Sequence, residues 1–396
     1  MISIKPTRSK RLGLGLLSGT SLDGIDAGLF EINGNTDSPS ISTKAFRVFP
    51  FSKSLHSSIL KNLNPESAKL NELSELNIAI ANAFADASLK LLKKERLPAT
   101  SVDFIGSHGQ TFWHDPKGGT LKTRSTFQLG DGSVIASRTG ILTVSDFRTA
   151  ELAFGSEGAP LVPFLDFALY RHQTENRVLI NIGGISNVTF LPRKTSRIEP
   201  IYFDAGPGNV LIDKAARLHF GVPFDSSGKF AKNGKANQLL LKEFLKEPFY
   251  KKRPPKSTGR ELFSDGYFER LTTRMNEEGL SKANHLATLT MLTVSTLAAQ
   301  IKRFILKRLT GEPLHLISIG GGGAKNTFMM ELLRGHFPNT RLVLQQELAM
   351  NCGGVLEAKA KEAALFALLA DAALSGISAS MKTPAILGKI SLPPVK

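Results

Sequence analysis

The sequence predicts an α/β protein of two domains, and three observations support this class. Apolar runs of strand length alternate with longer segments of helical periodicity along most of the chain. The 396 residues are more than one ordinary hydrophobic core accommodates. Apolar residues make up 41% of the sequence and charged residues 21%, which is the balance of a folded protein rather than a disordered one.

The individual elements are predicted from hydrophobic periodicity, with alternation indicating strands and a 3.6-residue period indicating helices. Strands are predicted at 12–17, 27–32, 43–49, 102–106, 141–145, 177–182, 187–192, 314–319 and 341–345. Helices are predicted at 66–95, 158–172, 207–219, 233–247, 265–278, 282–309, 325–336 and 353–373. The first three strands follow one another with no helix between them, so we expect an antiparallel start that a simple doubly wound sheet lacks.

Three of the predicted strands end in a glycine-rich turn. The segments are GLLSGTSLDG at 15–24, LINIGGISNV at 179–188 and LISIGGGGAKN at 316–326. The first two turns lead back into a strand, and the third leads into a helix. Glycine lets the backbone approach a ligand closely, and several N–H groups that point one way bind an anion. One such turn also suits an ordinary hairpin, but three of them in one basic chain favour phosphate binding.

The first turn, SGTSLDG, combines hydroxyl groups with a carboxylate. Ser18, Thr20 and Ser21 supply donors for phosphate oxygens, and Asp23 supplies a hard oxygen suited to Mg²⁺. The Lys-Ser or Lys-Thr pair of a P-loop is missing, and a strand rather than a helix follows, which excludes a dinucleotide fingerprint. A phosphate-binding hairpin of this kind points to the actin-like nucleotide-binding folds.

Charge, cysteine content and hydropathy narrow the class of protein further. The formal net charge of +16 attracts anions, so nonspecific binding of polyanions is an alternative role, although no DNA- or RNA-reading motif is found. The single cysteine, Cys352, excludes a disulfide framework and is predicted to be a small buried residue. No window approaches the roughly 18 apolar residues that span a bilayer, and the N-terminus lacks a signal-peptide core. We therefore expect a cytoplasmic protein with no membrane partner.

Eight separate motifs, in order along nearly the whole chain, resemble the anhydro-N-acetylmuramic acid kinase family. They are LLSGTSLDGID (16–26), SHGQTFWHDP (107–116), FQLGDGSVIASRTGILTVSDFR (127–148), GAPLVPFLD (158–166), NIGGISNVTFLP (181–192), FDAGPGNVLID (203–213), PKSTGRELF (255–263) and IGGGGAKN (319–326). The resemblance implies two ribonuclease-H-like domains of the actin-like ATPase class with an ATP cleft between them. We place the first domain at 1–130, joined by 376–396, and the second at 131–375.

The resemblance also implies the reaction and its ligands. Family members hydrolyse the 1,6-anhydro bond of anhydro-N-acetylmuramic acid and phosphorylate O6 with ATP and Mg²⁺, giving N-acetylmuramic acid 6-phosphate in cell-wall recycling. The expected partners are therefore an amino sugar and ATP, and the oligomeric state is left open between monomer and homodimer.

By resemblance, the site residues fall into four groups. The catalytic residues are Glu151 as general base and Arg148, the sugar-binding residues are His108, Gln110 and Asp204, and Asp23 is the metal ligand. The ATP-binding residues are Gly19, Thr20, Ser21, Leu22, Asp23, Gly24, Ile25, Asp26, Gly183, Gly184, Gly206, Gly208, Asn209, Gly320, Gly321, Gly322 and Asn326.

The stretch DFRTAELAFGSEGAPLVP (146–163) departs from the family pattern at the site itself. Glu151 stands where the family has an aspartate, Ser156 replaces a glycine, and Glu157 replaces a glutamine. A glutamate keeps the carboxylate, but it shifts the oxygens by about 1 Å, and misplacement on this scale can slow a reaction about 100-fold. A nucleotide- or sugar-binding relative with weak or no catalysis is therefore the alternative, and an exposed first-turn helix acid is the plain alternative for Glu151.

Overall fold

The computed structural model describes residues 9–19, 22–34, 39–259, 261–350, 353–380 and 382–395. The predicted site residues Thr20 and Ser21, and Cys352, lie outside these ranges. The chain forms two compact units, Met1–Leu169 with Met350–Lys396, and Tyr170–Ala349. These boundaries differ from the predicted ones at 130/131 and 375/376. The physical reason is that segments 131–169 and 350–375 pack with the first sheet and not with the second.

The sheet of the first unit begins with three antiparallel strands, as predicted. β1 (Lys10–Ser18), β2 (Ile25–Asn33) and β3 (Ser40–Phe49) form this part, and β4 (Phe104–Asp115) then pairs in parallel with β1. β6 (Thr143–Ser145) is parallel to β4, β12 (Lys389–Ser391) is antiparallel to β6, and β5 (Ser125–Leu129) forms a hairpin with β4. The order along the sheet is β12-β6-β4-β1-β2-β3.

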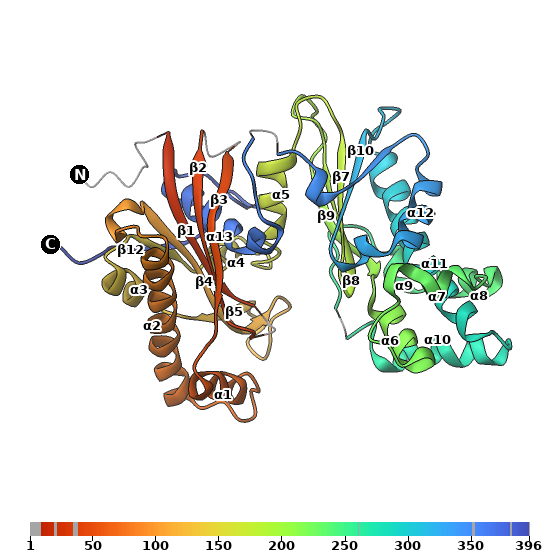
Figure 1. Cartoon of the computed structure of the whole chain (residues 1–396), viewed down its shortest axis with the longest axis horizontal. Helices are drawn as coiled ribbons and strands as arrows, with labels where there is room; N and C mark the ends of the chain where they lie inside the picture. The colour runs from red at the N-terminus through yellow and green to blue at the C-terminus, as the bar shows by residue number, and fades with distance from the viewer. Residues whose placement is uncertain are drawn as a thin grey trace. The chain divides into compact units, whose positions relative to one another are not determined.

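Two long helices cover this sheet (Figure 1). The helices of the unit are α1 (Lys53–Asn62), α2 (Leu70–Lys94), α3 (Gly132–Thr139), α4 (Thr149–Ala153), α5 (Val162–Tyr170) and α13 (Lys361–Leu374). Leu14 and Leu16 of β1 share a buried apolar cluster with α2. Gly15, between them, faces α13 so closely that a Cβ would collide with a backbone carbonyl of that helix. Because side chains alternate along a strand, α2 and α13 lie on opposite faces.

The sheet of the second unit repeats the same plan. β7 (Arg177–Ile182), β8 (Ile185–Leu191) and β9 (Ile201–Pro207) are antiparallel neighbours. β10 (Leu316–Gly320) pairs in parallel with β7, and β11 (Arg341–Leu344) pairs in parallel with β10. The order β9-β8-β7-β10-β11 matches β3-β2-β1-β4-β6 of the first unit. Each unit therefore has the ribonuclease-H-like arrangement, and the predicted two-domain α/β class is confirmed.

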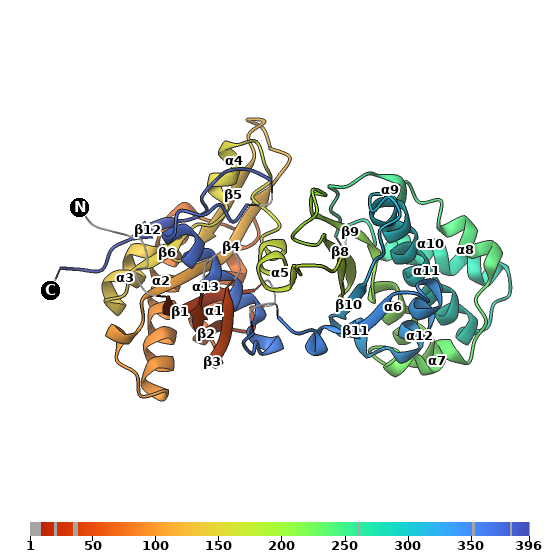
Figure 2. The ribbon, with the colours of Figure 1, turned by 90° about the horizontal axis from the view of Figure 1, so that it is seen from above.

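The helices of the second unit form one large core with its sheet. They are α6 (Val210–Phe220), α7 (Lys229–Lys232), α8 (Gln238–Phe244), α9 (Pro248–Lys251), α10 (Asp265–Glu277), α11 (Lys282–Ile301) and α12 (Thr327–His336). Figures 1 and 2 both show α8, α10 and α11 on the same side of the sheet. Among the described residues, only the helix Lys282–Leu306 is long and apolar enough to cross a membrane, and it is mostly buried in this core. Its apolar character is thus that of a core helix.

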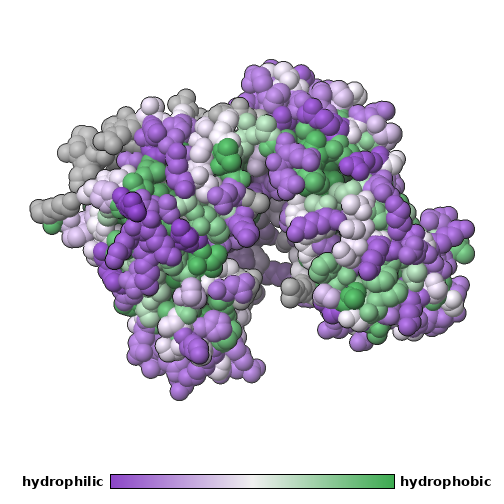
Figure 3. Space-filling view, viewed as in Figure 1, coloured by the Kyte–Doolittle hydropathy of each residue, from purple (hydrophilic) through white to green (hydrophobic). Residues whose placement is uncertain are grey.

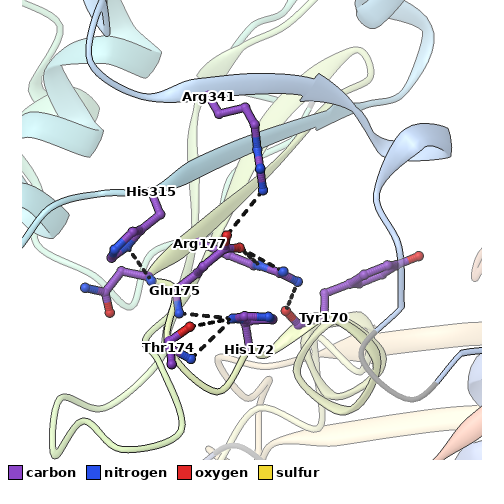
Figure 4. Close-up of polar contacts among 8 residues, drawn as sticks. Tyr170, His172, Thr174, Glu175, Arg177, His315 and Arg341 are labelled. Atoms are coloured by element: carbon purple, nitrogen blue, oxygen red, sulfur yellow. Dashed lines mark hydrogen bonds and ion pairs between the residues drawn. The ribbon is translucent and has the colours of Figure 1, made fainter.

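A cluster of ion pairs and hydrogen bonds holds the start of the second unit together (Figure 4). Arg177, which is nearly fully buried, forms an ion pair with Glu175 and donates a hydrogen bond to the carbonyl oxygen of Tyr170. Arg341 of β11 contacts the other oxygen of Glu175 at 3.3 Å. His172 accepts hydrogen bonds from the amides of residues 174 and 175. These contacts lie where β7 and β11 begin, at the opposite end of those strands from the glycine turns, which gives them a structural role.

Several predicted elements differ from those observed. The strands β5, β9 and β12 were not predicted, and the helix expected at 353–373 begins only at Lys361. Gly353 and Gly354 have positive φ, which ends helical geometry, and the amide of Thr43 donates to the carbonyl oxygen of Val355 at 2.8 Å. This segment therefore lies along β3 instead of forming a helix.

Hydrophilic residues cover much of the visible surface, with smaller hydrophobic groups between them (Figure 3).

Candidate active site

The first glycine turn follows β1 and is held by its own backbone. The amide of Leu22 donates to the carbonyl oxygen of Gly19 at 3.2 Å, and Leu22 has a φ of 57°. The side chains of Leu22 and Ile25 are buried in the core of the first unit. Of these two residues, only the backbone is available to a ligand. The turn can thus present amide groups to an anion while its apolar side chains anchor it.

A group of carboxylates lies beside this turn. Burial, followed by the negative charges of Glu362 on α13 and of Asp23, raises the pKa of Asp26 to about 6. Like charges that approach one another disfavour ionisation, and a bound cation relieves the repulsion. Among the described residues, however, no three His, Cys, Asp or Glu side chains are close enough to hold a metal ion unaided.

Buried polar atoms without partners lie where the end of β1 pairs with β4. Ser18 Oγ, Ser107 Oγ and Gln110 Oε1 have no hydrogen-bond partner among the described residues. Ser18 and Gln110 are paired in the register of the two strands. Buried polar atoms nearly always have partners, so an unsatisfied group of this kind indicates a place for a ligand or water. Sequence reasoning missed Ser107, although it lies within the SHGQT motif.

Glu151 lies in the first turn of α4 and is buried, with 4% of its surface exposed. The hydroxyl of Ser156 donates to its carboxylate at 3.3 Å. Asp146, with a φ of 53°, accepts hydrogen bonds from the amide and hydroxyl of Thr149 and so fixes the start of the helix. The plain alternative of an exposed helix acid is therefore wrong, because the side chain is enclosed and hydrogen-bonded.

Arg148 and His108 form a second polar group in the same unit. Arg148 Nε donates to His108 Nε2 at 3.1 Å, and Arg148 Nη1 donates to the carbonyl oxygen of Gly158 at 2.9 Å. His108 Nδ1 lies 3.2 Å from the carbonyl oxygen of Gly109, so this nitrogen carries the proton. Burial, followed by the charge of Arg148, lowers the pKa of His108 to about 3. His108 is therefore neutral at physiological pH, and both of its ring nitrogens are engaged.

Glu157, where the family has a glutamine, is paired with a basic residue. Its carboxylate lies 3.6 Å from the ammonium group of Lys382, and both side chains are partly exposed. Such an exposed pair contributes little to stability. Its negative charge is thus balanced from the C-terminal segment of the first unit.

The other two glycine turns lie in the second unit, where both meet near the end of β7 together with a further turn at Gly206 to Asn209. The amide of Gly208 donates to the carbonyl oxygen of Gly184, and the amide of Asn209 donates to that of Gly183, both at 2.8 Å. The side chain of Asn209 donates to the carbonyl oxygen of Ile182 at 3.2 Å. Gly321 packs on the same strand end, because a Cβ there would lie 2.6 Å from the Ile182 carbonyl oxygen. The ends of β7, β9 and β10 thus form one glycine-lined surface.

Two further predicted residues have roles in holding this unit together. Asn326 caps α12 by accepting a hydrogen bond from the amide of Met329 at 3.0 Å. Asp204 is buried at 9% exposure on β9, and its carboxylate accepts a hydrogen bond from the amide of Thr258 at 2.9 Å. Burial raises the pKa of Asp204, and the Thr258 amide opposes that shift. Gly206 and Gly320, at the ends of β9 and β10, and Gly322 belong to the same turns.

The family model and the curated relatives match nearly the whole chain. A family model described as anhydro-N-acetylmuramic acid kinase matches residues 11–390. The anhydro-N-acetylmuramic acid kinase of Caldanaerobacter subterraneus subsp. tengcongensis is 38% identical over 396 residues, covering 97% of this chain and 98% of the relative. That of Bacillus cereus strain ATCC 14579 is 38% identical over 390 residues, covering 96% and 97%. Among solved structures, a ROK hexokinase from Thermus thermophilus aligns with 90% of this chain and 97% of its own, at 12% identity and a TM-score of 0.37.

Proposed function

Because the chain belongs to the anhydro-N-acetylmuramic acid kinase family, we propose that it converts 1,6-anhydro-N-acetylmuramic acid, water and ATP to N-acetylmuramic acid 6-phosphate and ADP. The observation that carries the proposal is the family match over residues 11–390. The chain is accordingly a kinase.

Glu151 is the proposed general base. Its carboxylate takes a proton from a water molecule whose oxygen attacks the anomeric carbon C1 of the sugar. The C1–O6 bond breaks as the C1–OH bond forms, and O6 takes the γ-phosphoryl group, so that ADP leaves. One proton passes from the water to Glu151 and then to solvent. The buried setting of Glu151 and the hydroxyl of Ser156 support this role, because both restrict where the carboxylate lies.

Arg148 is proposed to act with Glu151 by stabilising negative charge on the sugar as the ring bond breaks. Its guanidinium is held by His108 and by the carbonyl oxygen of Gly158. Because both nitrogens of His108 are engaged, we assign His108 to the orientation of Arg148. Gln110, with its unpartnered Oε1, and Asp204 are the proposed hydrogen-bonding residues for the sugar.

The nucleotide is assigned to the glycine turns. In the first unit, the amides of Gly19 to Asp26 are proposed to bind phosphate oxygens. In the second unit, the turns at Gly183-Gly184 and Gly206 to Asn209 are assigned to phosphate, and Gly320 to Gly322 with Asn326 to the adenosine. The convergence of the three turns of the second unit on the end of β7 supports this assignment.

Mg²⁺ fits the carboxylates beside the first turn. The supporting feature is the set of neighbouring carboxylates: burial, followed by the charges of Glu362 and Asp23, raises the pKa of Asp26, and a cation would lower it. Asp23 and Asp26 would hold the ion, and phosphate oxygens and water would complete its shell, as is usual for Mg²⁺. When bound, the ion would neutralise charge on the phosphates.

Asp26→Asn is expected to remove the response of the protein to Mg²⁺. A carboxyl whose folded pKa is about 6 destabilises the fold above pH 6, and this effect disappears as pH falls towards 3.8, the ordinary pKa of an aspartate. The variant should therefore melt at a higher temperature than native protein at pH 8 without Mg²⁺, and should bind Mg²⁺ about tenfold or more weakly. Thermal unfolding with and without MgCl₂, at pH 8 and pH 4, measures both effects.

The matched control for this prediction is Asp86→Asn, which alters an exposed carboxylate paired with Arg138. It should retain the full Mg²⁺ response. A native-like Mg²⁺ response of Asp26→Asn at pH 8 would contradict the assignment.

Gly321→Ala is expected to weaken ATP binding about tenfold. Gly321 has a φ of 80°, and a side chain in left-handed geometry is strained by about 1–2 kcal/mol. The added Cβ also meets the Ile182 carbonyl oxygen, so the turn must shift. Isothermal titration with a nonhydrolysable ATP analogue measures the affinity. The control is Gly335→Ala on α12, where no atom lies near the new Cβ, and this variant should bind the ATP analogue with native affinity. Equal affinity of the two variants would exclude the assignment of the Gly321 turn to ATP.

The remaining expectations concern the cellular location, the polyanion binding and the oligomeric state of the protein. We propose the cytoplasm as its location, since ATP is available there and one cysteine suits a reducing compartment. The charge of +16 predicts weak, salt-sensitive retention of polyanions alongside this activity. Gel filtration of the purified chain distinguishes a monomer from a homodimer.

The test of the proposed function is an assay of ADP release with ATP, Mg²⁺ and 1,6-anhydro-N-acetylmuramic acid. ADP should appear only when the sugar is present, and mass spectrometry should identify the product as the 6-phosphate of the opened sugar. ATP and sugar binding without turnover would instead identify a binding protein that has lost catalysis.

A further inference from the structure

Lys256 is a buried cation without a carboxylate in direct contact among the described residues. Its ammonium group donates hydrogen bonds to the carbonyl oxygen of Phe249 and to Gln300 Oε1, both at 3.1 Å. It also lies 4.6 Å from the ring centre of Phe249, 5.7 Å from that of Phe304 and 6.0 Å from that of Phe203. A buried charge is expensive unless hydrogen bonds or aromatic faces compensate it, and here both do.

The partners of Lys256 are themselves fixed. Gln300, on α11, donates from Nε2 to the carbonyl oxygen of Tyr250 at 2.8 Å, which turns its Oε1 towards Lys256. The same helix carries Thr293, whose hydroxyl donates to the carbonyl oxygen of Gly208 at 2.9 Å. One face of α11 thus holds both the loop of Lys256 and a glycine turn of the proposed site.

The backbone around Lys256 leads directly to Asp204. The amide of Asp204 donates to the carbonyl oxygen of Lys256 at 3.0 Å, and the amide of Thr258 donates to Asp204 Oδ2 at 2.9 Å. Residues 256–258 therefore contact Asp204 through both its backbone and its carboxylate. A side chain that fixes residue 256 therefore also fixes the Thr258 amide, which together with the side chain of Tyr202 holds the Asp204 carboxylate by hydrogen bonds.

We infer that Lys256 is a positioning residue for the kinase reaction: its buried ammonium group anchors residues 256–258 to α9 and α11, and this anchor holds the Asp204 carboxylate in the orientation that binds the sugar. The inference rests on the proposed function for the role of Asp204. The anchor itself is a property of the second unit and can be tested without turnover.

The charges around Lys256 come from three elements. Burial, followed by the charges of Arg303 and Lys252 and opposed by that of Asp204, lowers the pKa of Lys256 to about 8. A lysine with a lowered folded pKa destabilises the fold below about pH 8, and this effect lessens as pH rises towards 10.5. Replacing it by methionine removes the buried charge but also removes the donor for the Phe249 carbonyl oxygen and Gln300 Oε1. Thermal unfolding of each variant is therefore measured as well, so that loss of positioning is separated from loss of folding.

The first test is hydrogen exchange of the Thr258 amide in native protein, Lys256→Met and Lys252→Met. Lys252 lies 6.0 Å from the same Phe249 ring, but it is exposed and is the matched control. The Thr258 amide should exchange about tenfold faster or more in Lys256→Met, as expected when one buried hydrogen bond is weakened. It should be unchanged in Lys252→Met. Gln300→Met removes the Oε1 acceptor of the Lys256 ammonium group and should reproduce the faster exchange. Native exchange of the Thr258 amide in both Lys256→Met and Gln300→Met would overturn the proposal that Lys256 anchors residues 256–258.

The second test is a double-mutant cycle with Asp204→Asn in the ADP-release assay. Lys256→Met should raise the KM for the sugar, or lower kcat, by about tenfold while leaving the KM for ATP unchanged, and should have little further effect once Asp204 is replaced. Additive effects of the two changes would show that Lys256 does not act through Asp204. If native protein has no sugar-dependent activity, the proposed function fails, while the exchange of the Thr258 amide still decides whether the anchor exists.

Discussion

Glu151→Gln is expected to lower sugar-dependent ADP release by about 10²–10⁴-fold, the range that general base catalysis contributes. Glutamine has the shape of glutamate and keeps an oxygen that can accept the hydrogen bond from Ser156. The fold and ATP binding should therefore be native, and only the ability to take a proton from water is lost. Steady-state kinetics together with ATP titration separates these two properties.

The control is Glu157→Gln, which changes a partly exposed carboxylate in the same segment that pairs with Lys382. It should leave the rate within about twofold, since exposed ion pairs are weak. Native activity of Glu151→Gln would contradict the role of Glu151 as base. Equal loss in both variants would indicate a general effect of the segment's charge rather than proton transfer.

Glu151→Asp tests whether this chain is adapted to the longer side chain. Ser156, where the family has glycine, contacts the carboxylate of Glu151 at 3.3 Å, so a shortened side chain should lose this contact and shift the base by about 1 Å. We expect a loss of about 100-fold, because a shift of that size commonly has such an effect. A gain of activity in Glu151→Asp would instead indicate that the glutamate has impaired the base.

The fold was predictable where the sequence signal is local. The three glycine turns do follow strands, and the antiparallel start of the first sheet is confirmed, because both depend on short apolar runs and on the glycines themselves. β9 was missed because its end, FDAGPG, has the composition of a loop, and only pairing with β8 makes it a strand. β12 has three residues and exists only through its pairing with β6.

The residues of the candidate site were predictable by motif, but their environments were not. Nothing local to Glu362 indicates that it approaches Asp26, because that contact forms only when α13 returns to the first sheet. The partner of Glu157 could not be predicted for the same reason, since Lys382 comes from the far end of the chain. The domain boundary was likewise misplaced, because the packing of 131–169 and 350–375 on the first sheet is a long-range property.

Asp371→Ala is expected to lower the free energy of unfolding of the first unit by about 3–5 kcal/mol, the effect of leaving one member of a buried ion pair alone. Arg11 Nε lies 2.5 Å from Asp371 Oδ1, and Arg11 Nη2 lies 2.9 Å from Oδ2, so the contact is bidentate. The two side chains are 5% and 0% exposed. The only tryptophan, Trp113, is on β4 of this unit, so its fluorescence during urea unfolding reports the unit directly.

Two further variants decide whether the effect comes from the unpaired charge. Arg11→Met with Asp371→Leu removes both charges and should recover much of the loss, because well-packed apolar residues often replace a buried pair without penalty. Asp86→Ala breaks the half-exposed pair with Arg138 and should change stability by no more than about 1 kcal/mol. A small effect of Asp371→Ala would contradict the prediction. Arg11 is on β1, and Asp371 is on α13, 360 residues later. The second unit lies between them in the sequence and is synthesised before α13. A large effect of Asp371→Ala would therefore mean that the first sheet reaches its full stability only after α13 has been synthesised and has packed against β1.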